Sequence, residues 1–305
     1  HIEAYLTSNE RYHGAIVGRV SGRMSGEGFM LNGVRYSLAN NDIWGKPSKN
    51  HLHGGIDNFS FQVWEADEVE HLPDGESVSF HYSSKDGEEG YPGNLSVTVI
   101  YKLTEDNTLS IHYHATTDQA TIISLTSHGY FNLSGDPRKN ILDHILYIPS
   151  EKTAECDDEL LPTGRIISLK DTALDFTTPR TVGSRMDENI PGQVFAGKGY
   201  VGGYVFDNSK GTPSLMAQLT DPDTGIRMEL FSDQPFLQLY NAWLFDGSDT
   251  GKNNVPYQSS CAIALEAQGF NDAPNHENFP SIVLKPGEVY RQETMYRFWG
   301  EGMIF

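Results

Sequence analysis

The chain has 305 residues, 38% hydrophobic and 11% aromatic, so it can bury a large core and is not intrinsically disordered. With 22 Lys and Arg against 41 Asp and Glu, its net charge of −19 argues against nucleic-acid binding and against docking on an anionic membrane surface. No apolar run reaches the roughly 20 residues of a membrane-spanning helix, and no signal peptide is visible among the polar first residues. Cys156 and Cys261 are expected to be free thiols, with one disulfide between them as the alternative, and a cytoplasmic location is expected.

The first candidate site lies at residues 50–55, with the sequence Asn-His-Leu-His-Gly-Gly. Paired glycines after a histidine let the backbone turn sharply or approach a ligand closely. The spacing predicts that His51 and His53 lie on one face of a strand. A metal site needs a third ligand at close range, and none is obvious nearby, so no metal is expected. A histidine that caps a turn fits the same pattern.

Residues 95–102 and 109–114 each alternate apolar and polar side chains, with the turn-like Glu-Asp-Asn at 105–107 between them. This period of two predicts a hairpin with one buried face.

A second candidate is His128, within the sequence Ser-His-Gly-Tyr-Phe-Asn-Leu at 127–133. Histidine titrates near neutrality and is a natural proton donor for reversible chemistry. The alternative is a core histidine whose hydrogen bonds are satisfied.

The segment 171–198 is rich in Thr, Pro, Asp and Gly and is expected to run over the surface, where long excursions often shape sites. A second hairpin is predicted at 215–230 around the turn Asp-Pro-Asp-Thr-Gly, and similar strand-turn-strand units at 200–206 and 289–298. With few helical stretches, the sequence predicts an all-β fold, a large antiparallel β-sandwich in one domain.

The third candidate is Glu266, which follows the apolar stretch 261–265. A carboxylate at the end of a buried strand needs a role, because burying an unpaired charge is costly. Glu266 is therefore either a member of a structural ion pair or a general base whose pKa is set by its surroundings.

These segments together resemble the galactose mutarotase (aldose 1-epimerase) family. The matches occur in family order: residues 12–19 followed by Arg23, residues 50–55, residues 128–133, the Gln-Leu-Tyr at 238–240, and a C-terminal set that begins at Glu266. The resemblance implies a large β-sandwich with an open sugar cleft.

The resemblance also implies roles for individual residues. Glu266 would be the general base and His128 the general acid, with His53 beside the ring oxygen. Arg23 and Gln238 would hold sugar hydroxyls, and Tyr130 would lie near the cleft wall. The reaction involves no redox change and no covalent intermediate, so no cofactor is expected. The expected partner is a small monosaccharide, bound by a monomer or homodimer.

The sequence departs from the family pattern in three places. Val201 stands where many members carry Asp, and Gly22 stands where Asn usually precedes the binding Arg. The chain starts at a point that resembles the inside of the usual domain. We therefore expect one domain over residues 1–305 that lacks the usual N-terminal strands.

Two other functions are compatible with these residues. The weakened contacts at Val201 and Gly22 suit a carbohydrate-binding protein that has lost turnover, although such a protein needs no acid/base pair. A hexose-6-phosphate 1-epimerase would need clustered Arg or Lys for the phosphate, and Arg180 and Arg185 are candidates.

Overall fold

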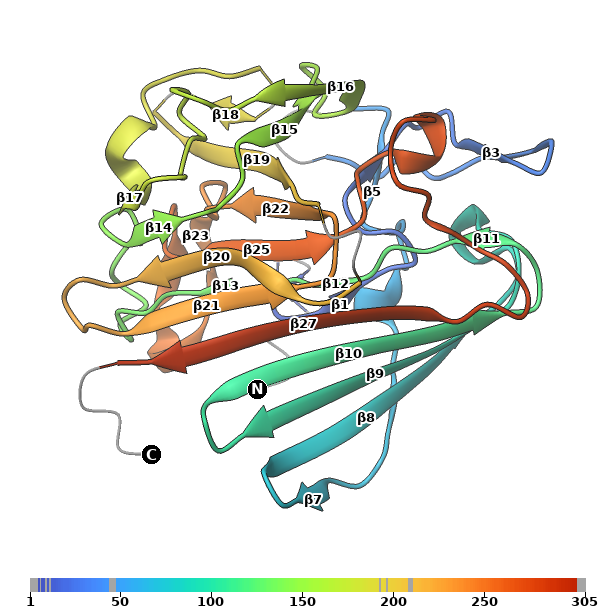
Figure 1. The fold of residues 1–305 in the computed structure, drawn as a ribbon, viewed down its shortest axis with the longest axis horizontal. Helices are drawn as coiled ribbons and strands as arrows, with labels where there is room; N and C mark the ends of the chain where they lie inside the picture. Colours follow the sequence, from blue (N-terminus) through green and yellow to red (C-terminus); the bar gives the residue numbers. More distant parts are fainter. Residues whose placement is uncertain are drawn as a thin grey trace.

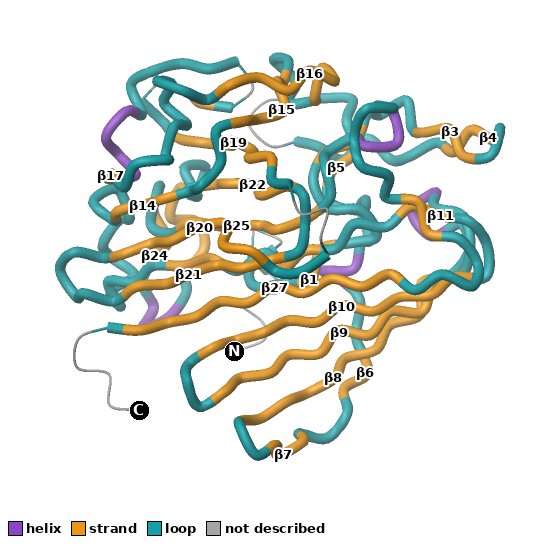
Figure 2. Tube along the Cα trace, in the orientation of Figure 1, coloured by secondary structure: helices purple, strands orange, loops and turns teal. Residues whose placement is uncertain are grey.

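The computed structural model describes residues 5, 7–8, 10, 12–43, 48–191, 193–195, 197–207 and 211–300. Strands dominate this part of the chain (Figure 2), and every ladder between them is antiparallel. Five short 3-10 helices lie between them: η1 (Phe59–Phe61), η2 (Glu88–Gly90), η3 (Val182–Arg185), η4 (Lys252–Asn254) and η5 (Ala273–Asn275). None of the described helices is long and apolar enough to cross a bilayer.

The largest sheet has ten strands (Figure 1). In spatial order they are β17 (Arg180–Thr181), β14 (Ile145–Tyr147), β20 (Ser214–Thr220), β21 (Arg227–Ser232), β27 (Tyr290–Trp299), β10 (Thr108–Thr117), β9 (Leu95–Thr104), β8 (Gly75–Ser84) and β6 (Glu65–Ala66), with β7 (Glu70–Leu72) also paired to β8.

A second sheet has five strands, of which β25, β22, β19 and β18 lie above β21 and β27 in Figure 1. In spatial order they are β13 (Tyr130–Phe131), β25 (Ile263–Gln268), β22 (Phe236–Tyr240), β19 (Gly199–Val205) and β18 (Val194–Phe195).

The remaining described strands form two-stranded pairs. They are β1 (Ile16–Val17) with β12 (Thr126–Ser127), β2 (Arg23–Met24) with β5 (His51–Leu52), β3 (Phe29–Leu31) with β4 (Val34–Tyr36), β11 (Thr121–Ile122) with β26 (Val283–Leu284), β15 (Lys152–Cys156) with β16 (Pro162–Ser168), and β23 (Asp246–Thr250) with β24 (Pro256–Gln258).

The main apolar core draws side chains from both large sheets. Val97, Ile111 and Leu230 come from the ten-stranded sheet, and Leu239 and Leu265 from the five-stranded one. Because side chains alternate between the two faces along each strand, the side chains on one face of each sheet pack into this shared core. The predicted all-β class and large antiparallel β-sandwich are confirmed.

Both predicted hairpins are present, as β9–β10 and β20–β21. The stretches 200–206 and 289–298, in contrast, are not strand-turn-strand units. Each contains a single strand. β19 pairs with the adjacent strand β18 and with the later strand β22, and β27 pairs with the distant strands β10 and β21. An unbroken ladder to those partners keeps the backbone extended where a turn was expected.

The expectation of a surface excursion at 171–198 is also wrong in part. Its Leu174, Phe176 and Val182 are completely buried and belong to the main core. The apolar side chains between its polar residues anchor the segment beneath the surface.

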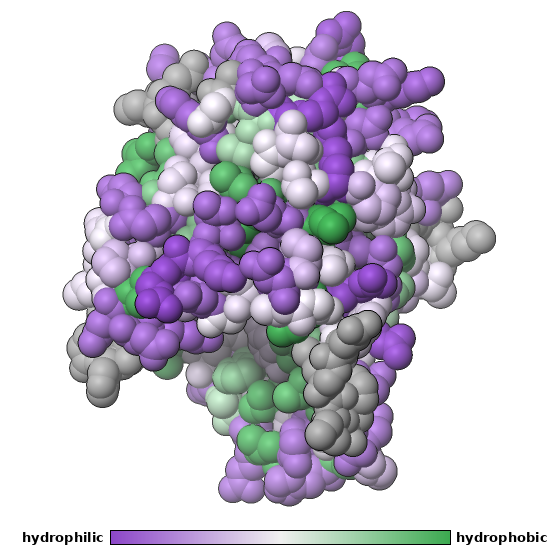
Figure 3. Space-filling model, turned by 90° about the vertical axis from the view of Figure 1, so that its left-hand side faces the viewer, coloured by the Kyte–Doolittle hydropathy of each residue, from purple (hydrophilic) through white to green (hydrophobic). Residues whose placement is uncertain are grey.

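The ends of β7, β8 and β9 project below the rest of the molecule (Figure 1). Figure 3 shows apolar side chains on this lower part, and Val69 and Leu103 are each more than half exposed. These side chains do not line the cavity described next.

Candidate active site

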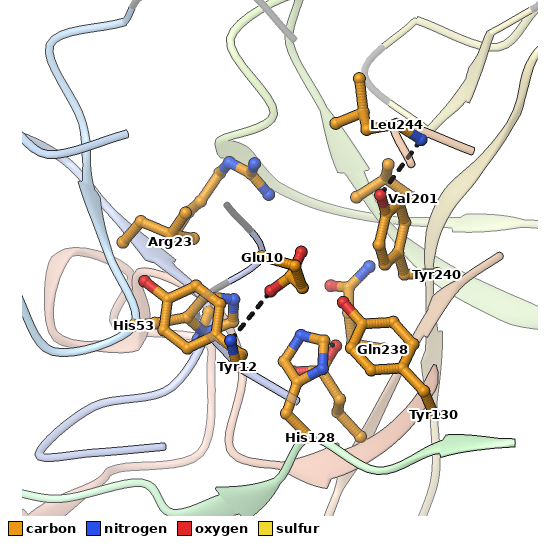
Figure 4. A pocket seen from close by; sticks show the side chains of 13 residues that line it. Glu10, Tyr12, Arg23, His53, His128, Tyr130, Val201, Gln238, Tyr240 and Leu244 are labelled. Atoms are coloured by element: carbon orange, nitrogen blue, oxygen red, sulfur yellow. Dashed lines mark hydrogen bonds and ion pairs between the residues drawn. The ribbon is translucent and has the colours of Figure 1, made fainter. Parts of the chain in front are cut away.

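One cavity brings together all six residues singled out from the sequence (Figure 4). Its lining consists of Glu10, Tyr12, Gly22, Arg23, Leu52, His53, His128, Tyr130, Val201, Gln238, Tyr240, Leu244 and Glu266. These residues come from β2, β5, β13, β19, β22 and β25, from the segments before β1 and β2, and from the segments after β5, β12 and β22. Positions more than 200 residues apart in the chain thus share one wall, which is typical of a binding site rather than of local packing.

Glu266 faces the cavity because of its register in β25. Ile263, Leu265 and Ala267 point into the core between the sheets, so the alternate residue Glu266 points to the other face. Its neighbour across the ladder is Gln238 of β22. Every residue of β25 is buried, which places the carboxyl group in a water-poor environment.

His128 lies next to this carboxyl group. Its backbone is fixed by two hydrogen bonds, from its N–H to Ala15 and to its carbonyl from Gly14. The Nε2 atom of His128 lies 3.5 Å from Oε1 of Glu266, and both side chains are almost completely buried, with exposures of 4% and 2%. Among the described residues, neither Nδ1 of His128 nor Oε2 of Glu266 has a hydrogen-bond partner. Unpartnered buried polar atoms in a cavity are the atoms that a polar ligand would satisfy.

Burial moves the pKa values of these two groups in opposite directions. It raises the pKa of Glu266 to about 8, with the charge of Glu10 adding to the rise and that of Arg23 opposing it. It lowers the pKa of His128 to about 3. The pair therefore holds one proton across the neutral range, and in the free protein this proton resides on Glu266. Two adjacent groups that share one proton can act as an acid/base pair.

His53 directly follows the short strand β5 and has a left-handed backbone, at φ 52°. Its Nδ1 accepts the N–H of Gly22 at 3.1 Å, and its own N–H donates to the Gly22 carbonyl at 2.9 Å. Burial, and then the nearby His128, lower the pKa of His53 well below its usual value, so the ring is neutral. With Nδ1 accepting, the proton of the neutral ring is on Nε2. His53 both holds the turn, as one interpretation of the sequence had it, and lines the cavity.

The prediction that His51 and His53 share a strand face is wrong. His51 turns away from the cavity, its Nδ1 2.8 Å from the Ala39 carbonyl and its Nε2 2.7 Å from the Tyr91 hydroxyl. The left-handed turn at His53, followed by Gly54 with φ 87°, breaks the strand geometry that the spacing implied.

His53, His128 and Glu266 are close enough to raise the question of a metal. One potential ligand atom from each lies within 4.8 Å of the others. A metal needs an unprotonated imidazole nitrogen, but the hydrogen bond from Gly22 occupies Nδ1 of His53 and leaves Nε2 protonated. This arrangement suits proton transfer and hydrogen bonding better than metal ligation.

Arg23 supplies a buried positive charge at the cavity. Its Nε donates to Oδ2 of Asp42 at 2.8 Å, and the two side chains are only 10% and 2% exposed. A guanidinium group carries five N–H donors, so donors remain after this ion pair is formed. Tyr130 lies against His128, with ring centroids 4.9 Å apart, and forms part of the wall.

Two of the departures noted in the sequence, Gly22 and Val201, line the cavity. Val201 belongs to β19, where it pairs with Tyr240, and it contributes an apolar side chain to the cavity wall. No described residue of the segment 171–198 lines the cavity, so the excursion does not shape this site.

Sequence reasoning missed Glu10, which lies in the cavity wall between Arg23 and Tyr240 (Figure 4). Its Oε1 accepts the N–H of Tyr12 at 3.0 Å, and its own N–H donates to Oδ2 of Asp249 at 2.9 Å. Glu10 is 5% exposed, but its polar neighbours in the sequence make it look like a surface residue. Its place two residues before the Tyr12 motif is the one local signal that it carries.

Comparison with known proteins gives a consistent result. The family model "Aldose 1-epimerase" matches residues 1–297. A galactose mutarotase from Bos taurus is 35% identical over 297 residues, covering 97% of this chain and 81% of that protein. An aldose 1-epimerase from Escherichia coli K12 is 30% identical over 293 residues, covering 94% and 80%. The crystal structure of a GalM/aldose epimerase homologue from C. elegans superposes with a TM-score of 0.82 at 28% identity, covering 98% of this chain and 86% of that one.

Proposed function

Because the chain belongs to the aldose 1-epimerase family, we propose that it interconverts the α and β anomers of a free aldose by acid/base opening and reclosure of the ring. The family expected from the sequence motifs is confirmed. The observation that carries the mechanism is the buried contact of 3.5 Å between Nε2 of His128 and Oε1 of Glu266, inside a cavity lined by hydrogen-bonding side chains.

The reaction needs one proton acceptor and one proton donor. Glu266 takes the proton from the anomeric hydroxyl while His128 gives a proton to the ring oxygen, and the C1–O5 bond breaks. Rotation about C1–C2 presents the other face of the aldehyde, and the same steps in reverse close the ring. All atoms and electrons balance within the sugar and the two side chains, so the chemistry calls for no cofactor.

The other lining residues would position the sugar. His53 presents its Nε2 proton beside the ring oxygen, Arg23 and Gln238 hold hydroxyls, and Tyr130 forms the wall next to His128. His128 and Glu266 together carry the one proton that the reaction requires, but in the free protein this proton is on Glu266. The proton must pass to His128 before the ring opens, and the distance of 3.5 Å between the two side chains makes that transfer short.

We expect kcat/KM to follow a bell-shaped pH profile. Activity requires one proton on the pair, so it should fall above about pH 8, where Glu266 loses that proton, and fall toward about pH 3, where His128 gains a second. Polarimetry on freshly dissolved α-glucose and α-galactose, corrected for the spontaneous reaction at each pH, measures this profile. A kcat/KM that stays constant from about pH 6 to beyond about pH 9 would contradict the assignment.

Glu10→Gln should move the basic limb of that profile to lower pH. The negative charge of Glu10 disfavours ionised Glu266 and so raises its pKa; removing the charge lets Glu266 lose its proton earlier. The matched control is Glu10→Asp, which keeps the charge and should keep the limb near its wild-type position. A basic limb that stays in place or moves to higher pH in Glu10→Gln would contradict the claim that the charge of Glu10 raises the pKa of Glu266.

The competing functions make different predictions in the same assay. Val201 favours a binding protein without turnover, which would bind glucose, galactose, xylose or arabinose and accelerate mutarotation of none. A hexose-6-phosphate enzyme would prefer glucose 6-phosphate. The candidate phosphate ligands do not support it, because Arg180 donates to the Ala173 carbonyl, Arg185 contacts Glu188, and neither lines the cavity.

A further inference from the structure

Gly22 sits in the cavity wall directly before Arg23 and has a left-handed backbone at φ 75°. Both of its backbone polar groups are bonded to His53. A β-carbon on residue 22 would lie 1.8 Å from Oδ1 of Asn271 and 2.7 Å from Nε2 of Gln268. The carboxamide of Asn271 therefore already fills the space that a side chain on residue 22 would enter.

Asn271 is the centre of a buried chain of amides that ends in the cavity. Its Oδ1 accepts from Nε2 of Gln268 at 2.8 Å, and its Nδ2 donates to Oε1 of Gln238 at 3.2 Å. The other end of the Gln238 amide, Nε2, donates to the Gly202 carbonyl at 2.9 Å. The three side chains are at most 8% exposed. Gln238 is thus held from both ends, with its oxygen directed by Asn271.

The backbone beside Asn271 follows the strand that carries Arg23. The N–H of Asp272 donates to the Arg23 carbonyl at 2.9 Å, and Oδ1 of Asp272 accepts the N–H of Ser25 at 3.0 Å. This register places the Asn271 side chain over Gly22 and within reach of Gln238. If the oxygen of a buried amide loses its hydrogen-bond donor, the amide either rotates or carries an unsatisfied polar atom at a cost in free energy. The orientation of the Gln238 amide therefore depends on Asn271.

We propose that Asn271 is a positioning residue for sugar binding: its carboxamide fills the space beside Gly22 and fixes the Gln238 amide for a sugar hydroxyl. The inference rests on the function proposed above. Asn271 does not line the cavity, so it acts through Gln238 and Gly22 and not on the reacting atoms.

The test is a double-mutant cycle with Asn271→Ala, Gly22→Asn and the double variant. Asn271→Ala should raise KM for the preferred aldose about tenfold, with a smaller change in kcat and no shift of the pH limbs. Gly22→Asn alone should be worse, because its side chain meets that of Asn271. In the double variant the Asn271 side chain no longer obstructs position 22, and of the close contacts only the amide end of Gln268, at 2.7 Å from the new β-carbon, must shift. Asparagine tolerates a positive φ, so KM should recover beyond the product of the single effects. Additive effects, or an unchanged KM in Asn271→Ala, would overturn the inference.

Two further variants separate positioning from folding. Asn271→Asp has the same shape but replaces the donor to Gln238 with an acceptor, so it should also raise KM; an unchanged KM counts against the inference even if Asn271→Ala fails to fold. Asn275→Ala is the matched control, because that side chain donates to the Gly28 carbonyl and to Asp272 instead of to a lining residue. It should lower Tm and leave KM unchanged.

These outcomes are distinct from failure of the proposed function. If the wild type accelerates mutarotation and Glu266→Gln abolishes it while Asn271→Ala and Asn271→Asp behave as wild type, the function stands and only the role of Asn271 falls.

Discussion

Glu266→Gln is expected to lower kcat for mutarotation by about 10²–10⁴, with a much smaller effect on KM. The amide has the shape of the carboxyl group but cannot take a proton from the anomeric hydroxyl. The variant retains His128 as a donor, so its residual activity should fall as pH rises and His128 is found less often protonated. Polarimetry at several pH values measures both effects, and wild-type kcat in this variant would exclude Glu266 as the base.

The same substitution should not unfold the protein. Because the pKa of Glu266 is raised to about 8 in the folded state, the folded chain holds a proton that the unfolded chain releases at a lower pH. The free energy of unfolding therefore decreases as pH rises from the unfolded pKa, near 4.5, to about 8. A neutral Gln has no such dependence. Thermal unfolding at about pH 5 and about pH 8 should show a smaller loss of Tm in Glu266→Gln than in the wild type.

The local parts of this fold could be predicted from the sequence because their signals are local. The alternation at 95–114 and the turn residues at 221–225 identify two hairpins without knowledge of any distant partner. The pairing of the long strand β27 was harder to predict, because its place between β10 and β21 depends on residues about 180 and about 70 positions away. A short run of sequence carries no record of such partners.

The residues of the candidate site likewise divide into those that local sequence identifies and those that it does not. His53, His128 and Glu266 stood out because a titratable side chain beside paired glycines, aromatics or a buried strand is unusual. Glu10 did not stand out, since its burial comes from a cavity that brings together segments from Tyr12 to Glu266. Asn271 could not be identified from the sequence either. Its proposed role depends on the absence of a side chain at Gly22, and the two residues are neighbours only in the folded chain.

His128→Asn is the second variant expected to have a large effect. It should lower kcat by about 10²–10⁴, since the ring oxygen loses its proton donor and water must replace it. The pH dependence should be opposite to that of Glu266→Gln. Without His128, activity depends only on ionised Glu266. The residual kcat should therefore rise with pH through the basic range and then level off, so that the pH profile is a single ascending curve instead of a bell.

A buried histidine outside the cavity provides the control. His144 is 2% exposed, its Nε2 accepts the N–H of Leu133 and its Nδ1 lies 3.8 Å from Asp221. His144→Asn should reduce Tm and leave kcat and its bell-shaped profile intact. If His128→Asn and His144→Asn lose activity equally, or if the two active-site variants share one pH slope, the two groups do not act as a proton-sharing pair. Opposite slopes are the outcome that an acid and a base with one proton between them must produce, because each variant leaves the other partner to titrate alone.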